Sequence, residues 1–349
     1  MTIAERVPLA PLTTFRIGGP ARFVAECSDE DDIKAALAFA RERGLPYAVL
    51  GGGSNLLASD AGYDGVVIRP MLGAGAYAPA YEDQPDGSVL LTAGAGVSWD
   101  ALVASACERG LWGLENLSGI PGTLGGAVFQ NIGAYGAALS QTLEWAEALD
   151  AQTGETRRFP LEECAFGYRI SRFKQDAGRY IILRAGLRLA RAFAPNLSYR
   201  DPNKAYKDIA RIFSENPNPA LADIRRAIRS IRADKFPDLS REGTAGSFFE
   251  NPVLPESAAR ALLERYPDMP LFPMPETAGM KVPAGWILDH VLHMRGYEMG
   301  RARLFENQAM VVVARFGAAA ADVDALAREV EKRVHGATGI AIEREVRSL

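Results

Sequence analysis

A long glycine-rich segment, residues 113–136 (GLENLSGIPGTLGGAVFQNIGAYG), constrains this chain more than any other feature. Its glycines are interleaved with hydroxyl and amide side chains, and charged residues are nearly absent. A structureless loop of this length inside a compact domain is usually functional. The uncharged polar groups suit hydrogen bonds to a large neutral ring system and to phosphates. The alternative interpretation is a compact surface loop with a purely structural role.

A second glycine motif, here called the glycine turn (Gly51–Asn55), lies upstream in VLGGGSNLL, residues 49–57. It follows an expected buried strand at residues 47–50. Glycines let backbone N–H groups approach an anion closely, and Ser54 and Asn55 add side-chain donors. A diphosphate is the ligand that these groups favour. A tight turn that binds nothing is the alternative.

Neither glycine motif has the spacing of a common nucleotide-binding fingerprint. There is no G-x-G-x-x-G that opens a helix and no G-x-x-x-x-G-K-[ST] loop. The sequence Gly94-Ala95-Gly96 lacks the third glycine and has Trp99 near its place. Nucleotide binding, if it occurs, is therefore not expected to use a Rossmann domain.

Apolar periodicity predicts the regular elements around these motifs. A helix is expected over residues 28–43, with Ser28 as its cap and one apolar face. The other expected helices lie at 99–109, from 221 with an apolar face over 224–231, at 255–266 and at 320–334. The other expected strands lie at 65–68, 88–93, 143–150, 180–189, 309–313 and 340–347. Residues 190–220 and 267–283 are expected to form loops.

Composition narrows the classes of function. The 39 basic and 43 acidic residues leave a net charge of −4, which argues against a general nucleic-acid binder. The three cysteines lack CxxC spacing, so they predict neither a disulfide framework nor a zinc site and fit a reducing cytoplasm. No signal peptide is apparent, and no run of about 18 apolar residues offers a membrane span.

The three histidines, His290, His293 and His335, give little support to histidine-based chemistry. His290 and His293 are expected to lie on one helix, but a metal pair there would need further ligands, so no metal is predicted. Packing or surface roles are the simpler interpretation. A Ser-His-Asp hydrolase is not expected either, because no G-x-S-x-G elbow is present.

Six motifs in a fixed order carry a resemblance to a known family. They are TTFRIGGPA (13–21), VLGGGSNLL (49–57), LSGIPGTLGGAVFQNIGAYG (117–136), FGYRIS (166–171), GSFFENP (246–252) and IEREVR (342–347). Together they resemble the UDP-N-acetylenolpyruvoylglucosamine reductases (MurB) over almost the whole chain. The segment NLSYRDP around Tyr199 resembles the type I subgroup, in which a tyrosine-bearing loop closes over the substrate.

The resemblance implies an α+β fold with three parts. Two FAD-binding subdomains of the vanillyl-alcohol-oxidase type are expected at 1–70 and 71–220. An α+β substrate-binding domain is expected at 221–349, and its C-terminal strand returns to the flavin site. A monomer is expected.

The resemblance also implies which residues hold FAD. The diphosphate is assigned to Gly51, Gly52, Gly53, Ser54 and Asn55. Further cofactor residues are expected at Ser118, Gly122, Gly125, Gly126, Asn131 and Gly133. Some relatives attach flavin covalently through a histidine, but this chain has none before His290, so FAD is expected to bind non-covalently.

The implied reaction adds hydride to the double bond of UDP-N-acetylglucosamine enolpyruvate, with NADPH as the reductant of FAD. Negative charge then develops at C2 and in its carboxylate, which calls for electrostatic stabilisation and a proton donor. By motif match, Ser247 donates the proton and Arg169 binds the carboxylate, supported by Tyr168. Glu345 is expected to be protonated, or engaged with Arg169, during hydride transfer. Without the resemblance, a cap for Ser247 and an Arg–Glu ion pair would be preferred.

The same resemblance assigns Tyr199, Lys235, Asn251 and Gln308 to the substrate, and Lys235 in particular to its diphosphate. Phe305 is a departure, because many members have a histidine there, and this makes the alignment of Gln308 less secure. Two other hypotheses remain open from sequence: another flavin oxidoreductase of the same fold group, and a non-catalytic nucleotide-sugar binding protein. Flavin colour in the purified protein separates the second of these from the enzymes.

Overall fold

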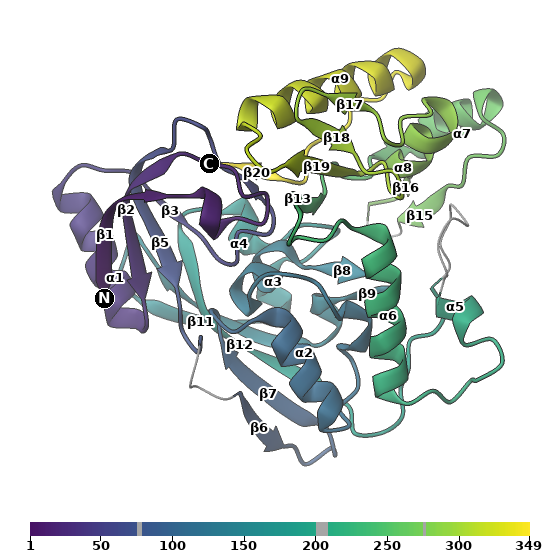
Figure 1. Cartoon of the computed structure of the whole chain (residues 1–349). Coiled ribbons are helices and arrows are strands. Elements are labelled where there is room, and N and C mark those ends of the chain that lie inside the picture. Colours follow the sequence, from purple (N-terminus) through teal and green to yellow (C-terminus); the bar gives the residue numbers. More distant parts are fainter. Residues whose placement is uncertain (75–78, 200–208, 275–276) are drawn as a thin grey trace. The chain divides into compact units, whose positions relative to one another are not determined.

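The computed structural model describes residues 1–74, 79–199, 209–274 and 277–349 (Figure 1). By its internal contacts the chain divides into two compact units. Unit 1 comprises Met1–Val7, Pro20–Gly52 and Tyr63–Arg232, and unit 2 comprises Pro8–Gly19, Gly53–Gly62 and Ala233–Leu349. The finer division into domains at 1–70, 71–220 and 221–349 stays a prediction.

The first sheet of unit 1 has the order β1-β2-β5-β3, and β5 pairs in parallel with both β2 and β3. Its strands are β1 (Thr2–Pro8), β2 (Pro20–Cys27), β3 (Tyr47–Val49) and β5 (Tyr63–Pro70). Because β5 is central, Val66, Val67 and Ile68 are all fully buried, as expected for a strand covered on both faces.

Helix α1 (Glu30–Glu42) packs against β2 and β5 through the expected apolar face. Its cap is Asp29 and not Ser28, so that expectation was wrong by one residue. The Asp29 side chain accepts a hydrogen bond from the Asp32 amide at 2.9 Å. The Ser28 amide instead donates to the Asp32 side chain at 2.9 Å.

The second sheet of unit 1 is antiparallel, with the order β11-β10-β12-β7-β6. Its strands are β6 (Ala80–Asp83), β7 (Val89–Gly94), β10 (Leu143–Asp150), β11 (Thr156–Pro160) and β12 (Tyr180–Leu189). The bounds of β10 and β12 are those predicted from the sequence. Helix α3 (Leu124–Gln130) packs on β12 and β7 (Figure 1).

The glycine-rich segment is not structureless, so that expectation was wrong. It contains a 3-10 helix (Glu115–Leu117), α3 and the short strand β8 (Gly133–Ala134). Burial of Leu124, Ala127 and Val128 stabilises α3 in spite of its two glycines. The regular structure therefore depends on tertiary packing that local propensity does not reveal.

The remaining elements of unit 1 lie between strands of the second sheet in sequence or follow that sheet. They are α2 (Trp99–Glu108), β9 (Ala137–Ala138), a 3-10 helix (Leu139–Gln141), a 3-10 helix (Leu161–Cys164), α4 (Arg172–Gln175), α5 (Ile209–Ile212) and α6 (Leu221–Lys235). Residues 190–220 were expected to be a loop, yet they contain α5; residues 200–208 lie outside the described part. Helix α6 belongs to unit 1 as far as Arg232.

Unit 2 combines a four-stranded sheet, β13-β19-β18-β17, with a three-stranded one, β14-β16-β15. Helix α9 packs on β17, β18 and β19. The strands are β4 (Leu56–Leu57), β13 (Glu242–Ser247), β14 (Val253–Pro255), β15 (Phe272–Met274), β16 (Gly279–Lys281), β17 (Glu298–Met299), β18 (Ala302–Leu304), β19 (Val311–Arg315) and β20 (Arg347–Ser348). The helices are a 3-10 turn (Ala10–Leu12), α7 (Glu256–Arg265), α8 (Ala284–Trp286), a π-helical turn (Ile287–Val291) and α9 (Ala320–Thr338).

Three sequence expectations for unit 2 were wrong. Residues 267–283 are not only loop, because they contain β15 and β16. The expected strand at 340–347 is reduced to β20, preceded by a single bridge between Arg344 and Phe249. His290 lies in the π-helical turn, while His293 lies beyond it with a φ of 50°, so the two do not share a helix.

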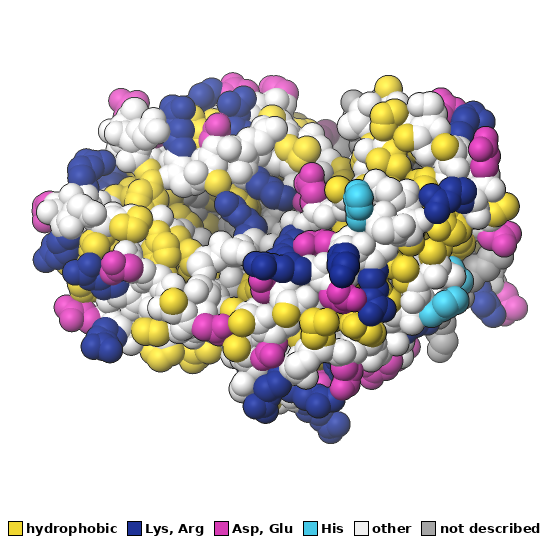
Figure 2. Space-filling model, turned by 90° about the horizontal axis from the view of Figure 1, so that it is seen from above, with side chains coloured by type: hydrophobic (Ala, Val, Ile, Leu, Met, Phe, Trp, Pro, Cys, Tyr) yellow, Lys and Arg dark blue, Asp and Glu magenta, His cyan; other side chains and the backbone are white. Residues whose placement is uncertain are grey.

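Two surface properties of the described residues bear on partners. Acidic and basic side chains are interspersed over the face that Figure 2 shows. Within the described ranges, none of the helices has the length and apolar character that crossing a membrane requires.

Candidate functional site

The first two residues of the glycine turn, Gly51 and Gly52, lie against the glycine-rich segment inside unit 1. A β-carbon built on Gly52 would lie 2.6 Å from the Cα of Gly122, and one on Gly51 would lie 3.0 Å from Oγ1 of Thr123. Only glycine permits the approach at Gly52. Among the described residues, the amides of Gly51 and Gly52 donate no hydrogen bond. The two segments assigned to one cofactor are therefore adjacent, with two backbone donors left for a ligand.

The two glycines of α3 have different surroundings. Thr123 caps the helix, and its side-chain oxygen accepts a hydrogen bond from the Gly126 amide at 3.4 Å. A β-carbon on Gly125 would lie 2.9 Å from that of Ala95, so Gly125 permits close packing. Apart from the backbone of α3, the one described atom within 4 Å of a β-carbon on Gly126 is Oγ1 of Thr123, at 3.7 Å. The space beside Gly126 is therefore open to a bound group.

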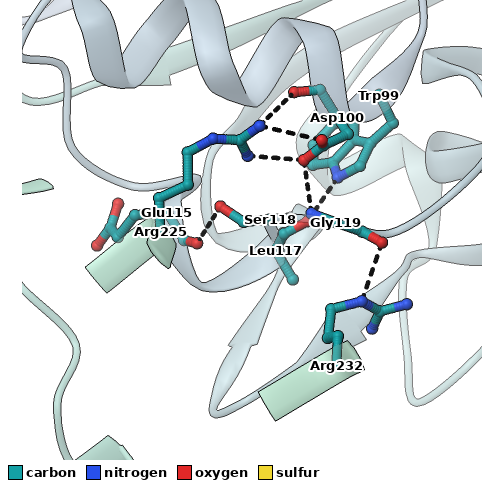
Figure 3. Close-up of polar contacts among 8 residues, drawn as sticks. All are labelled: Trp99, Asp100, Glu115, Leu117, Ser118, Gly119, Arg225 and Arg232. Atoms are coloured by element: carbon teal, nitrogen blue, oxygen red, sulfur yellow. Dashed lines mark hydrogen bonds and ion pairs between the residues drawn. The ribbon is translucent and has the colours of Figure 1, made fainter. Parts of the chain in front are cut away.

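Figure 3 shows how α2 and α6 hold Gly119 in place. The Gly119 amide donates to the Asp100 carboxylate at 2.5 Å, and its carbonyl accepts from Nε of Arg232 at 2.9 Å. Both terminal nitrogens of Arg225 donate to Asp100, at 2.6 and 3.0 Å. We call Asp100, Arg225 and Arg232 the Gly119 clamp.

The electrostatics of the clamp follow from burial and pairing. Burial opposes ionisation of Asp100, but hydrogen bonds from Arg225 and Gly119 outweigh it and hold the pKa of that carboxyl below its usual range. Burial lowers the pKa of the Arg232 guanidinium, and interaction with Tyr135 opposes this. The sequence analysis missed the clamp. Its one sequence signal is that Arg225 and Arg232 are seven residues apart on a helix, which places them on one face.

Beside the clamp, Glu115 is nearly fully buried. Burial raises the pKa of its carboxyl, while hydrogen bonds from backbone amides, Gly113 among them at 2.7 Å, oppose the shift. Ser118, an expected cofactor residue, is fully buried and donates its hydroxyl hydrogen to the Glu115 carbonyl at 2.6 Å. The hydroxyl hydrogen of Ser118 is thus bound within the protein.

Two buried amide oxygens in the glycine-rich segment have no hydrogen-bond partner among the described residues. They are Oδ1 of Asn116, in a side chain 1% exposed, and Oε1 of Gln130, in a side chain 9% exposed. Buried polar atoms are normally satisfied by protein, water or ligand. Gln130 lies in a motif quoted above, directly before Asn131, but it was not assigned a role. Its oxygen makes it a further candidate contact for a bound group.

Arg169 lies in unit 1, in a tight turn. Its backbone φ is 57°, and its terminal nitrogen Nη2 donates to the Gly133 carbonyl at 3.0 Å. The guanidinium carbon lies 5.4 Å from the centre of the Tyr168 ring, so the expected support by Tyr168 has a physical basis. Arg169 and the expected cofactor residue Gly133 are therefore neighbours.

Tyr199 also lies in unit 1. Its ring packs edge-on against Tyr135, with the ring centres 5.6 Å apart. Asn116 donates its side-chain amide hydrogens to the carbonyls of Tyr135 and Asn196, at 2.9 and 2.8 Å. The segment that leads to Tyr199 is thus bound to the glycine-rich segment.

In unit 2, the second half of the glycine turn is fixed by backbone fit. Gly53 has a φ of 63°, and a β-carbon on it would lie 2.0 Å from the Leu12 carbonyl oxygen. Its carbonyl accepts from the Thr14 amide at 3.1 Å. After the turn, β4 pairs in parallel with the C-terminal strand β20. Ser54 belongs to the same stretch of unit 2.

In unit 2, the chain next to Ser247 is hydrogen-bonded to Glu345. Ser247 ends β13, opposite Val311 of β19. The next carbonyl, that of Phe248, accepts from the Glu345 amide at 2.9 Å, and the Glu345 carbonyl accepts from the side chain of Asn55 at 3.1 Å. Two hydrogen bonds therefore connect Glu345 to Phe248, the residue after the proposed catalytic Ser247, and to Asn55 at the end of the glycine turn.

The other expected substrate residues of unit 2 lie as follows. Gln308 is 6% exposed, and its Oε1 has no hydrogen-bond partner within the described ranges. Asn251 accepts from the Ala284 amide at 3.0 Å through Oδ1. Lys235 has its ammonium 5.8 Å from the centre of the Phe236 ring. Phe305, noted above as a departure from the family pattern, is buried against Val311 and Val313 of β19.

Comparisons with known proteins identify the family of this chain. Residues 21–160 match the model of an FAD binding domain, and residues 238–349 match that of the UDP-N-acetylenolpyruvoylglucosamine reductase C-terminal domain. The expected fold class is thereby confirmed. A UDP-N-acetylenolpyruvoylglucosamine reductase of Pseudomonas aeruginosa is 41% identical, over 99% of this chain and 98% of its own length.

Further relatives extend this similarity. One of the same name from Azoarcus sp. is 38% identical, over 99% of this chain and 97% of its own length. The crystal structure of UDP-N-acetylenolpyruvylglucosamine reductase (MurB) from Thermus caldophilus aligns with a TM-score of 0.68 at 27% identity, covering 100% of this chain and 99% of that one. Similarity at this level, over nearly the full length, shows that the chain belongs to the UDP-N-acetylenolpyruvoylglucosamine reductase family.

Proposed function

We propose that this protein reduces UDP-N-acetylglucosamine enolpyruvate to UDP-N-acetylmuramate for peptidoglycan synthesis, with FAD as cofactor and NADPH as reductant. The observation that carries the proposal is the full-length similarity to reductases of this name, together with a matching C-terminal domain that contains Ser247 and Glu345. As a member of this family the chain is an FAD-dependent oxidoreductase.

The residues of unit 1 fit a bound flavin dinucleotide. The glycine turn and the glycine-rich segment lie against each other, and the Gly51 and Gly52 amides donate to nothing among the described residues. The space beside Gly126 offers room for the cofactor. The buried Oε1 of Gln130, which has no partner among the described residues, offers it a hydrogen-bond acceptor. FAD, when bound and reduced by NADPH, supplies the hydride that adds to C3 of the enolpyruvyl group.

In this addition, Arg169 is proposed to stabilise the negative charge that develops, and Ser247 is proposed to donate the proton. As negative charge develops at C2 and spreads into the carboxylate, the Arg169 guanidinium binds the two carboxylate oxygens and remains charged throughout. The Ser247 hydroxyl then donates its proton to C2. A serine is a weak acid in water, but a carbanion-like centre is far more basic. Glu345 is proposed to be protonated during this step, because an ionised carboxylate would repel the developing charge.

Tyr199, Lys235, Asn251 and Gln308 are proposed to bind the substrate, and Lys235 its diphosphate. The unpaired Oε1 of Gln308 supports this, since a buried acceptor without a protein partner calls for a donor from a ligand or water. Asn251 accepts a hydrogen bond from the Ala284 amide through Oδ1, which fixes the orientation of its side chain. We propose that the protein works as a monomer in the cytoplasm, where its three free cysteines would stay reduced.

The decisive experiment separates the two half-reactions. Under anaerobic conditions, NADPH should bleach the bound flavin, and UDP-N-acetylglucosamine enolpyruvate should then restore its colour. A flavin that the enolpyruvyl compound does not reoxidise would overturn the function and favour another oxidoreductase of the same fold group. A colourless protein after gentle purification would favour the non-catalytic binding protein.

Replacing Ser247 tests its role within the same assay. For Ser247→Ala we expect near-normal bleaching and a second half-reaction slowed by about 10²- to 10⁴-fold, because only that step needs the proton. Rapid-quench or stopped-flow absorbance measures both phases. Equal loss in both phases would mean that Ser247 is structural.

A further inference from the structure

The turn that carries Arg169 is unusual for its residue type. The amide of Gly167 donates to the Ile170 carbonyl at 3.1 Å, and the amide of Ile170 donates to the Gly167 carbonyl at 3.2 Å. Between them, Arg169 has a φ of 57°, a conformation that glycine or asparagine normally adopts in such turns. A strained residue of this kind persists only when its surroundings determine it.

Two side chains grip the backbone of this turn. Nδ2 of Asn131 donates to the Gly167 carbonyl at 2.9 Å, and the Lys174 ammonium donates to the Arg169 carbonyl at 2.9 Å. The Ser171 hydroxyl, just after the turn, donates to the Phe129 carbonyl at 2.6 Å. The turn is thereby tied to the end of α3 on one side and to α4 on the other.

Both the oxygen and the nitrogen of the Asn131 side-chain amide form hydrogen bonds. It ends α3 in the left-handed conformation, with φ 42° and ψ 61°, and is 6% exposed. Its Oδ1 accepts from the Ser140 amide at 3.1 Å, while its Nδ2 binds the Arg169 turn. The side chain therefore bridges two protein segments, and the cofactor contact that the resemblance implies for Asn131 stays a prediction.

We propose that Asn131 and Lys174 are positioning residues that hold the Arg169 turn, and so the guanidinium beside Gly133, in place for the substrate carboxylate. The proposal rests on the proposed role of Arg169. The end of the glycine-rich segment and the carboxylate-binding arginine then form one rigid piece of unit 1. A small displacement of Arg169 is enough to matter, because misplacement of about 1 Å can cost about 100-fold in rate.

The test uses Asn131→Asp and Lys174→Met in the flavin-loaded enzyme. Asn131→Asp keeps the acceptor for Ser140 and tolerates the left-handed backbone, but it places an oxygen against the Gly167 carbonyl. Lys174→Met keeps the length of the side chain and removes the donor. Gln84→Glu and Lys34→Met are matched controls: Gln84 donates to a backbone carbonyl on an exposed turn, and Lys34 pairs with Glu30 on α1.

We expect both test variants to keep FAD content, the flavin spectrum and the rate of bleaching by NADPH. Reoxidation by the enolpyruvyl substrate should slow by about tenfold or more, with a higher KM for that substrate. Lys174→Arg, which keeps a donor, should recover part of the loss. Both controls should behave as the wild type in both half-reactions.

Several results would overturn the proposal. Loss of FAD from Asn131→Asp alone would make Asn131 a cofactor ligand. Equal losses in both half-reactions would make both residues merely structural, and unchanged reoxidation in both variants would remove them from positioning. If wild-type flavin is not reoxidised by the enolpyruvyl substrate at all, the proposed function fails instead, and the two failures are thus distinct.

Discussion

The glycine turn and the glycine-rich segment contain the same residue type for different physical reasons. At Gly52 and Gly53, a β-carbon would lie 2.6 and 2.0 Å from backbone atoms that cannot move aside. At Gly125 the nearest atom is another β-carbon, and at Gly126 there is space. The turn is therefore shaped by backbone contact, whereas the longer segment is held by side-chain hydrogen bonds, made to it by Asp100 and Arg232 and from within it by Asn116 and Asn131.

The comparison predicts that the two regions will respond differently to mutation. Changes in the turn should damage folding, because no neighbouring atom can relax. Changes around the longer segment should act through single hydrogen bonds or ion pairs, with smaller and more local consequences. Three substitutions test this difference.

Gly53→Ala should have the largest effect. The new methyl group would meet the Leu12 carbonyl oxygen at 2.0 Å, and the φ of 63° is itself unfavourable for alanine. We expect the free energy of unfolding to fall by about 3 kcal/mol or more, measured by urea denaturation. The matched control is Gly126→Ala in α3, where space is available and alanine is the better helix former. Similar losses in both variants would mean that the two regions do not differ in how tightly the backbone is packed.

Asp100→Asn should have an intermediate effect, since it removes the charge from the Gly119 clamp. Hydrogen bonds to charged groups contribute about 1.5–3 kcal/mol, so a loss of about 2 kcal/mol is expected at neutral pH. The pKa of Asp100 is lowered in the folded protein, so the stabilisation is present above its usual pKa and is lost as the pH falls through the lowered value.

Thermal unfolding of wild type and Asp100→Asn across an acid pH series measures this. The difference in Tm should narrow as the pH falls. Asp83→Asn, which breaks an exposed pair with Arg191, is the control and should change little. A difference that stays constant with pH would mean that the charge of Asp100 is not what holds Gly119.

Glu115→Gln should have the smallest effect. Burial raises the pKa of Glu115, so this carboxyl stays protonated to a higher pH in the folded protein than in the unfolded chain. Stability conferred by that proton is present below the usual carboxyl pKa and declines as the pH rises through the raised value. Glutamine retains an acceptor for the Gly113 amide. Its Tm should show a weaker decline with rising pH in this window, and an unchanged pH profile would contradict the prediction.

Sequence patterns predicted the fold best where burial alone decides it. The bounds of β10 and β12 were predicted from stretches rich in apolar residues. Helix α1 was predicted from the helical spacing of its apolar residues. Helix α3 was missed because two glycines disfavour a helix locally, while its burial against β12 depends on the tertiary structure. The strand expected at 340–347 was wrong for a related reason, because among the described residues this stretch pairs only through β20 and one bridge.

For the site, the sequence predicted which residues take part and their order, but it did not predict which of them contact each other. The adjacency of Gly52 and Gly122 joins positions far apart in the chain, and nothing local to either indicates it. The clamp on Gly119 joins three separate segments in the same way. Asn131 is a further example. Its position in a cofactor motif predicted a ligand contact, whereas its side-chain hydrogen bonds to Gly167 and Ser140 could be found only from the structure.

The left-handed backbone of Arg169 has a consequence for protein engineering. A selection for thermal resistance alone would reward a residue that adopts φ 57° readily, and glycine or asparagine does so at lower cost than arginine. Such a selection would therefore tend to discard the very guanidinium that the proposed chemistry needs. Stabilised variants of this protein should keep position 169 unchanged and seek their gains elsewhere.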